Sequence, residues 1–265
     1  MKMMTIASGS SGNSIYIGSE TTSIILDVGV AAKRIKEASD KLGMDVTDID
    51  AIFITHEHID HIKGLGVICR KYKIPIYATY GTIDGIMQCK SLGVFDYNLL
   101  KPIRSGESIL IGDIMVTSHA ISHDAAEPVC YKFECDKKKI SVATDLGVYD
   151  NSIIDFLSES QAMLIEANHD IRMLEAGDYP FYLKNRILGN KGHLCNEASG
   201  RLIRQLLNPD LKYILLGHLS DKNNYPGLAL QAVKNELMGN DYFDDLDKLE
   251  LLVAPRYECS QIYNI

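Results

Sequence analysis

The sequence predicts a layered α/β protein, and three observations carry this prediction. Short β-rich runs recur in both halves of the chain with helical stretches between them, as in sheets covered by helices. Hydrophobic residues make up 46% and charged residues 23%, which is typical of a globular protein and excludes a disordered chain or a coiled coil. The 265 residues show no linker or repeat, so a single domain is expected.

The first half of the chain is predicted to consist mainly of strands, because β-branched and aliphatic residues cluster between Gly, Ser and Asn. Two helices interrupt them, one over about 30–42 and one that begins with Asp60 as N-cap and runs to about 72. The predicted strands are 3–7, 14–18, 22–28, 51–55 and four runs within 109–144.

The second half repeats the mixture of strands and helices. Its pattern predicts two packed sheets with helices outside them. The predicted strands are 162–167 and 213–217, and the predicted helices are a stretch up to about 188, then 197–207 and 228–238.

Charge and hydropathy limit the partners. The net charge is 27 − 35 = −8, which makes the chain a poor general binder of nucleic acid, so a phosphate-bearing substrate needs a local positive site. No apolar run approaches the roughly 18 residues of a membrane span, and the first residues lack the apolar core of a secretory signal. Six cysteines occur without a C-x-x-C pair, as expected of reduced, mostly buried thiols. We therefore expect a cytoplasmic protein that does not bind membranes.

The segment T-H-E-H-I-D-H at 55–61 is the strongest local signal, and it directly follows the predicted strand 51–55. In extended backbone, His56 and His58 point to the same side, whereas Glu57 between them points away. Asp60 and His61, at the start of the next helix, can turn toward a second point nearby. Imidazole and carboxylate groups are the ligands that borderline divalent metals prefer. The alternative is a polar surface loop in which the histidines occur by chance.

This motif resembles that of the metallo-β-lactamase-fold hydrolases, and the resemblance covers nearly the whole chain. It implies an αββα four-layer sandwich in a single domain over 1–265, with all metal ligands on loops at one edge. Further family elements follow in the expected order: D-V-G at 27–29, His123 in S-H-D, Asp145 in A-T-D and His218 in L-G-H-L-S. By this match, one metal ion takes His56, His58, His123 and Asp145, and the other takes Asp60, His61, Asp145 and His218.

The resemblance therefore implies two divalent metal ions, with zinc, manganese or iron as candidates. Two ions about 3.5–4 Å apart can share a hydroxide that attacks an ester or a phosphoryl group. Asp60 is thus expected to be a catalytic residue as well as a ligand. The motif is specific for the fold and the metals but says little about the substrate.

Three further residues near the motif have two readings each. Asp27 is either an acceptor that orients a ligand imidazole or a solvated carboxylate at a strand end. His119, inside a predicted strand, is favoured as a core histidine or as a support of the ligands, and His123 is preferred as the ligand itself. His169 in A-N-H-D is either a loop histidine with local hydrogen bonds or a direct metal contact.

The late motifs narrow the branch of the fold. The strings G-H-L-C-N-E-A at 192–198 and L-G-H-L-S at 216–220 resemble the phosphodiesterase branch that includes ribonuclease Z. In that branch the earlier histidine, here His193, is catalytic, and a glutamate on a preceding strand, here Glu166, pairs with it. The alternative is that His193 caps or packs against the following helix.

Spacings and short strings narrow the branch further. Only 22 positions separate His123 from Asp145 (145 − 123), and only 48 separate Asp145 from His193 (193 − 145). These leave no room for the long tRNA-binding arm of ribonuclease Z or for an inserted β-CASP domain. S-G-S-S-G-N, E-A-N-H-D and G-H-L-S-x-x-N-N are most similar to the YycJ (WalJ) branch, which is associated with 5′-exonuclease activity on DNA. Cys195 departs from this pattern, since the branch more often has serine there.

Candidate substrate-binding residues lie near the late motifs. They can line a phosphate groove, or they are ordinary solvated charges on helix surfaces. The turn 8–13 can present backbone N–H groups to a phosphate, although a tight turn explains the same glycines and is slightly favoured. The candidates are Arg172, Lys184, Arg186, Lys191, Lys222 and Asn196.

Three functions are compatible with these features. The favoured one is a two-metal phosphodiesterase, a DNA 5′-exonuclease with DNA preferred over RNA. The second is a small-molecule hydrolase of the same fold, such as a thioesterase like glyoxalase II or a lactamase; the expected pair of Glu166 and His193 argues against it. The third is a non-catalytic binding protein, against which the complete ligand set argues.

Overall fold

The computed structural model describes residues 1–238 and 249–265, which form two compact units. The N-terminal unit comprises Met1–Ala120, Ala125–Asp136 and Pro255–Asn264. The C-terminal unit comprises Ile121–Asp124, Ile265 and the described part of Lys137–Ala254. Over the described residues the strands belong to two sheets, as predicted. A single domain over the whole chain stays a prediction.

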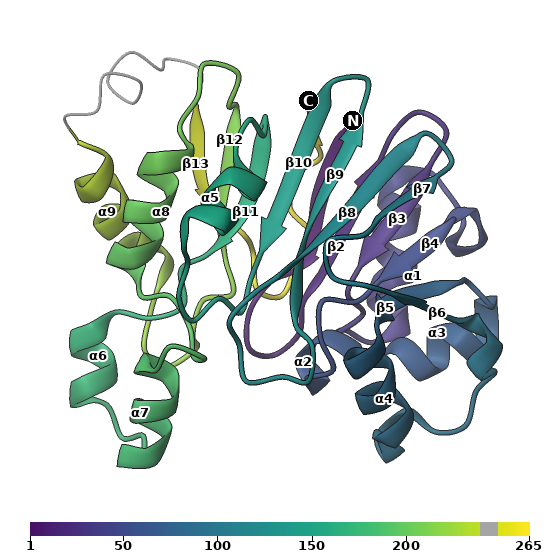
Figure 1. The fold of residues 1–265 in the computed structure, drawn as a ribbon, viewed down its shortest axis with the longest axis horizontal. Helices are drawn as coiled ribbons and strands as arrows, with labels where there is room; N and C mark the ends of the chain where they lie inside the picture. Colours follow the sequence, from purple (N-terminus) through teal and green to yellow (C-terminus); the bar gives the residue numbers. More distant parts are fainter. Residues whose placement is uncertain (239–248) are drawn as a thin grey trace. The chain divides into compact units, whose positions relative to one another are not determined.

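The N-terminal unit contains a seven-stranded sheet (Figure 1). The strand Tyr263–Asn264 and the first three strands of the chain pair antiparallel. The third strand and the next three pair parallel, which requires crossover connections. The sheet order is β14 (Tyr263–Asn264), β1 (Lys2–Ala7), β2 (Ser14–Gly18), β3 (Ser23–Leu26), β4 (Ala51–Phe53), β5 (Ile76–Thr79) and β6 (Leu100–Ile103). The connections contain α1 (Ala32–Leu42), α2 (Ile59–Ile62), α3 (Leu65–Tyr72) and α4 (Tyr80–Gln88).

Three antiparallel strands complete this unit: β7 (Ser108–Ile111), β8 (Ile114–Ala120) and β9 (Val129–Cys135). Aromatic side chains join them to the first sheet. The Phe53 ring packs edge-on against the Tyr131 and Phe133 rings, at centroid distances of 5.4 and 6.4 Å. The Tyr131 hydroxyl donates to the Ile54 carbonyl over 3.0 Å, which places the end of β4 against β9.

Two sequence predictions fail near the motif at 55–61. Asp60 is not an N-cap; the helix begins at Ile59 with His58 as N-cap. The predicted helix 60–72 is also broken into α2 and α3. The break follows from Gly64, whose N–H donates to the Val28 carbonyl over 2.8 Å, and where a Cβ would meet the Val30 carbonyl oxygen at 2.0 Å. The sequence analysis also missed β5, β6 and α4.

The C-terminal unit is built on four parallel strands with helices in the connections (Figure 1). All five residues of β11 are buried, as expected of a parallel strand covered on both faces. The strands are β10 (Lys138–Ala143), β11 (Ala162–Glu166), β12 (Tyr213–Gly217) and β13 (Glu250–Val253). The helices are α5 (Asn151–Leu157), α6 (Ile171–Ala176), α7 (Phe181–Leu188), α8 (Asn196–Leu206) and α9 (Pro226–Leu237). The sequence analysis missed α5 and β13.

All six cysteines are free thiols. Of the helices in residues 1–238 and 249–265, none is both long and apolar enough to cross a bilayer.

Candidate metal and catalytic site

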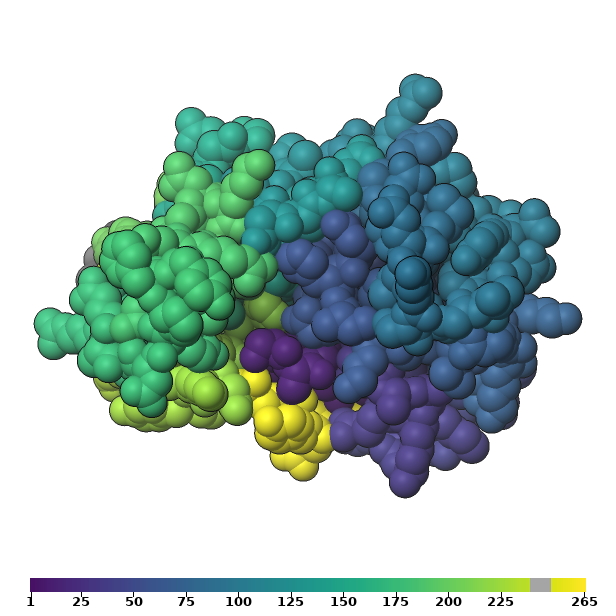
Figure 2. All heavy atoms as spheres, turned by 90° about the horizontal axis from the view of Figure 1, so that it is seen from below, coloured from purple at the N-terminus to yellow at the C-terminus, as the bar shows by residue number. Residues whose placement is uncertain are grey.

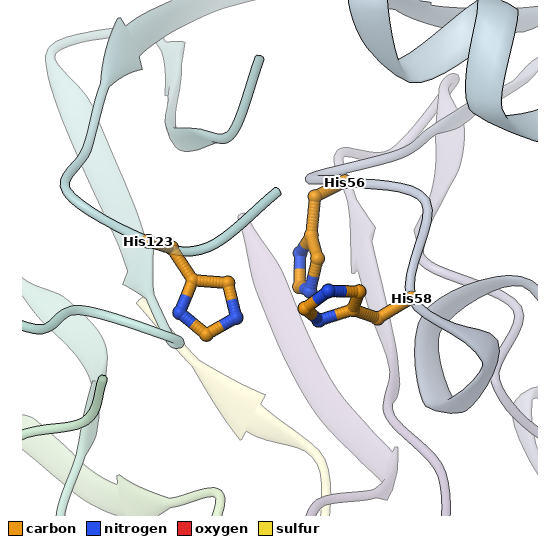
Figure 3. A group of neighbouring side chains, drawn as sticks. All are labelled: His56, His58 and His123. Carbon is orange, nitrogen blue, oxygen red and sulfur yellow. The ribbon is translucent and has the colours of Figure 1, made fainter. Parts of the chain in front are cut away.

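The histidine motif lies where the chain leaves β4. His56 and His58 project from the loop between β4 and α2, and their rings converge at a centroid distance of 4.6 Å (Figure 3). His61, in α2, brings its ring centroid to 4.2 Å from that of His56. The side chain of Asp60 is 21% exposed and reaches 3.6 Å from His61 Nε2. The N-terminal unit therefore gathers three imidazoles and a carboxylate, as the motif predicts.

The buried Asp27 carboxylate contacts this group of histidines through hydrogen bonds. Asp27 follows β3 with φ +60° and is 1% exposed. Its Oδ2 lies 2.7 Å from His61 Nδ1, and its Oδ1 accepts the Thr55 N–H over 2.9 Å. Thr55 Oγ1 in turn lies 3.0 Å from His56 Nδ1. The Nδ1 atoms of His56 and His61 thus both have partners within this unit, on the side of each ring away from Nε2.

Close backbone contacts hold the loops around the histidine motif together within the N-terminal unit. A Cβ on Gly29 would lie 1.6 Å from the Asp60 carbonyl oxygen, so only glycine fits there. The Asn13 N–H donates to the same carbonyl over 2.8 Å. The Asn13 side chain also binds the N–H and the carbonyl of Gly9 over 2.9 and 3.1 Å. The N–H groups of Gly9, Gly12 and Asn13 are therefore occupied by partners within the chain, as expected of a tight turn.

Glu57 points away from the histidines, as expected. Its Oε1 accepts the Ala126 N–H over 2.8 Å.

The C-terminal unit holds a second group of the predicted site residues. Asp145 follows β10 and His218 follows β12, with φ values of +58° and +53°. This left-handed conformation is uncommon for residues other than glycine and turns each side chain out of its strand direction. His123 lies on the loop after β8 (Figure 3), and its Nδ1 is 3.1 Å from the Gly192 carbonyl. In this unit, ligand atoms of Asp145, Glu166, His193 and His218 all lie within 4.8 Å of one another.

Glu166 at the end of β11 holds two imidazoles. It is fully buried, and its Oε1 lies 2.8 Å from both His193 Nδ1 and His218 Nδ1. Its Oε2 accepts the N–H groups of Leu146 and Leu194 over 2.9 and 3.1 Å. Burial alone would raise its pKa, but the charges and hydrogen bonds of His193 and His218 outweigh burial and lower the pKa of Glu166 to about 2. Glu166 is therefore an anion that accepts four hydrogen bonds.

Four of the predicted ligand histidines share one feature: within its own unit, each has an oxygen atom within hydrogen-bond distance of Nδ1. A partner at Nδ1 fixes the tautomer and leaves Nε2 to bind a metal, the usual arrangement of metal-ligating histidines. The donor set of imidazoles and carboxylates suits a borderline divalent ion. The pairs are His56 with Thr55, His61 with Asp27, His123 with Gly192, and His218 with Glu166.

The remaining candidate histidines are not in these groups. His119 lies in β8 on the half-exposed face of the strand rather than in the core. His169 is 1% exposed, and neither of its ring nitrogens has a hydrogen-bond partner among the described residues. This differs from a loop histidine with local hydrogen bonds. Burial lowers the pKa of His169 to about 4, so the ring is neutral.

The predicted substrate-binding residues have different surroundings. Asn196 is fully buried and bonded to Asn224 over 3.1 Å, so it holds the loop rather than offering a surface for substrate. Arg186 binds Asp124 through two nitrogens, at 2.5 and 3.0 Å. Lys184 Nζ donates to the Glu175 carbonyl over 2.7 Å. Arg172 and Lys191 are exposed.

The sequence analysis missed two features here. Thr55 supports an imidazole, and its place in the motif was a signal that could have been used. The pair of Asp124 and Arg186 joins residues 62 positions apart, for which the sequence held no signal.

Comparisons with known proteins agree with this geometry. The profile of the metallo-beta-lactamase superfamily matches residues 7–218. The exodeoxyribonuclease YycJ of Bacillus anthracis is 36% identical over 232 residues, which cover 88% of this chain and 87% of that protein. The exodeoxyribonuclease WalJ of Streptococcus pneumoniae is 38% identical over 240 residues, which cover 91% and 89%.

Solved structures show the same fold at low identity. The metallo-beta-lactamase fold protein YhfI of Bacillus subtilis superposes with a TM-score of 0.72 at 16% identity, covering 99% of this chain and 98% of that one. Zinc-bound PqqB of Methylobacterium extorquens superposes with a TM-score of 0.73 at 13% identity, covering 100% of both chains.

Proposed function

Since this chain belongs to the metallo-β-lactamase superfamily, to the branch of the YycJ and WalJ exodeoxyribonucleases, and is a metal-dependent hydrolase, we propose that it removes nucleotides from DNA ends by hydrolysing phosphodiester bonds. DNA is proposed over RNA because both relatives are named for activity on DNA. The observation that carries the proposal is the Glu166 carboxylate with two imidazoles at 2.8 Å. A cytoplasmic location fits the free thiols and is part of the proposal.

The proposed metal centre holds two divalent ions, zinc, manganese or iron. When bound, such ions polarise a phosphoryl oxygen and activate water. The ligand assignment follows the family resemblance, and the occupied Nδ1 atoms in each unit support it. One ion takes His56, His58, His123 and Asp145, and the other takes Asp60, His61, Asp145 and His218.

We assign His193 the role of proton donor to the leaving group. An alkoxide leaves poorly at neutral pH unless a proton reaches it as the bond breaks. The ionised Glu166 carboxylate at His193 Nδ1 favours the imidazolium, so that the other ring nitrogen can give up its proton. The His193 side chain is 14% exposed while Glu166 is not exposed at all, so His193 alone of this pair can touch a substrate.

The test uses end-labelled DNA, as single strands and as duplexes, with and without a 5′-phosphate, and the same sequences as RNA. The protein is assayed with zinc, manganese or iron and with a chelator. We expect metal-dependent release of nucleotides from DNA ends, slower release from RNA, and none with chelator. His119→Gln serves as the matched control, because this histidine lies outside the ligand groups. Cleavage of a thioester without cleavage of any phosphodiester would overturn the proposal in favour of a small-molecule hydrolase.

A further inference from the structure

Two adjacent aromatic side chains on the C-terminal unit have no role in the chemistry described above. Phe181 is 79% exposed and Tyr182 is 73% exposed, both in the first turn of α7. Among the large hydrophobic residues that the structure describes, only Val94 is more exposed than Phe181. Figure 2 shows the segment with α6 and α7, in green, on the surface of this unit. Two adjacent aromatic side chains exposed to solvent are typical of a binding surface.

The segment that carries these rings contains basic residues, of which Arg186 is paired with Asp124. Residues 179–191 contain two lysines and one arginine and no acidic residue, in a chain of net charge −8. The Lys222 ammonium adds a further charge, 5.6 Å from the centre of the Tyr179 ring. Asp178 and Glu175 precede the segment and lie outside it. Aromatic rings among cations match the chemistry of single-stranded nucleic acid, whose bases stack on rings while its phosphates meet lysine and arginine.

Hydrogen bonds within the C-terminal unit connect the C-terminal end of α7 to the backbone of His193 and to the loop that carries His123. The His193 N–H donates to the Ile187 carbonyl over 3.0 Å. The Ser122 hydroxyl donates to the Asn190 carbonyl over 2.7 Å, and Arg186 binds Asp124 beside His123. The position of α7 relative to His193 is therefore fixed within this unit.

The length of α7 sets the distance between Phe181 and Ile187. Six residues from Phe181 to Ile187, at about 1.5 Å per residue, span about 9 Å. Ile187 is the residue whose carbonyl accepts the His193 N–H, so the aromatic pair and the contact with His193 lie at opposite ends of α7.

We infer that Phe181 and Tyr182 form a stacking platform for unpaired bases of the DNA strand that is being degraded. The inference rests on the proposed function and adds to it how the strand is gripped. Because every base has an aromatic face, the grip is independent of sequence. It requires unpaired bases, so single-stranded or frayed ends bind better than closed duplex ends.

The binding test compares the wild type with the double variant F181A/Y182A and with Tyr80→Ala, which removes an exposed tyrosine from the N-terminal unit. A fluorescent, 5′-phosphorylated single strand is titrated with each protein in chelator, so that nothing is cut. We expect the Kd of the double variant to rise about 10-fold or more, since removal of one stacking ring costs about 5- to 150-fold. Tyr80→Ala should bind as the wild type does.

An abasic probe shows whether bases carry this effect. A strand without bases near its 5′ end should bind the wild type about 10-fold more weakly, and the double variant no more weakly than the normal strand. Equal binding of both strands by the wild type, or an unchanged Kd in the double variant, would overturn the inference. A contact between two copies of the chain would be indicated instead if the double variant lost only self-association in light scattering.

Kinetics separate this inference from the proposed function. On single-stranded DNA the double variant should show a raised KM and a nearly unchanged kcat, and on a p-nitrophenyl phosphodiester, which has no bases, it should equal the wild type. If the wild type cuts neither substrate, the proposed function fails. The binding result still decides whether the aromatic pair holds bases.

Discussion

Two buried carboxylates, Asp27 in the N-terminal unit and Glu166 in the C-terminal unit, do the same structural task under opposite electrostatic conditions. Each ends or follows a strand, is almost inaccessible to water and binds a histidine at Nδ1. Asp27 faces one imidazole and Thr55, and burial, its largest influence, raises its pKa. Glu166 faces two imidazoles, whose effect exceeds that of burial and lowers its pKa to about 2. The second imidazole at Glu166 therefore accounts for the opposite directions of the two pKa shifts.

Asp27 and Glu166 differ in the histidines that they contact, and therefore in the roles that we expect for them. We propose that Asp27 orients the His61 imidazole and so supports metal affinity. We propose that Glu166, which lies 2.8 Å from Nδ1 of both His218 and His193, orients His218 for metal binding and also supports the chemical step through His193. Substitutions can separate these tasks, because metal content and turnover are measured independently.

The largest effect is expected from Asp145→Ala, because this carboxylate is proposed to bridge both ions. Metal content should fall from about two ions per chain to well below one, and activity should be lost. Asp60→Ala is the matched control, since it removes a ligand of one ion only and should leave most of the first ion bound. Full metal occupancy in Asp145→Ala, by elemental analysis, would refute the bridging role.

The comparison itself is tested by Glu166→Gln against Asp27→Asn. Glu166→Gln removes the anion beside His193 and should lower kcat by about 10²–10⁴. Asp27→Asn leaves the catalytic pair intact and should weaken metal affinity by about 10- to 100-fold, with kcat recovered at saturating metal. Recovery of both variants at saturating metal would mean that Glu166 has no role beyond that of Asp27.

A smaller effect, on the pH dependence of stability, is expected from His169, which is buried in the C-terminal unit. Its pKa is about 4 in the folded chain against 6.5 as the ordinary value. As pH falls from 6.5 to 4, the unfolded chain takes up a proton that the folded chain refuses, so the free energy of unfolding falls by up to about 1.4 kcal/mol per pH unit. In chelator, urea unfolding of His169→Gln should show a flatter dependence over this range. An identical dependence in both proteins would contradict a neutral buried His169.

The smallest effect compares surface charges of the two units. Lys191→Ala removes an exposed cation near His193 and should reduce the slope of log KM for single-stranded DNA against log salt by about 0.7, one phosphate contact. Lys63→Ala removes an exposed lysine from the N-terminal unit and should leave the slope unchanged. The reverse result would place the strand on the other unit.

Much of the site was readable because its residues follow strands directly. Asp27, Glu166 and His218 each come at the end of an apolar run, where the sequence already marks the edge of a sheet. What failed depends on contacts distant in sequence. The break at Gly64 is set by the carbonyls of Val28 and Val30.

The same reason explains the missed surface features. The burial of Asn196 depends on Asn224, 28 residues away. Phe181 is hydrophobic but exposed to solvent, so the pattern of hydrophobic residues in the sequence cannot predict its exposure.

The most direct test of the central claim is the activity of His193→Ala on two substrates. With DNA, whose leaving alkoxide needs a proton, kcat should fall by about 10²–10⁴. With a p-nitrophenyl phosphodiester, whose leaving group needs none, the loss should be far smaller, and metal content should equal that of the wild type. An equal loss on both substrates, or a loss of metal, would contradict the assignment of His193 as proton donor and make it a ligand or a structural residue.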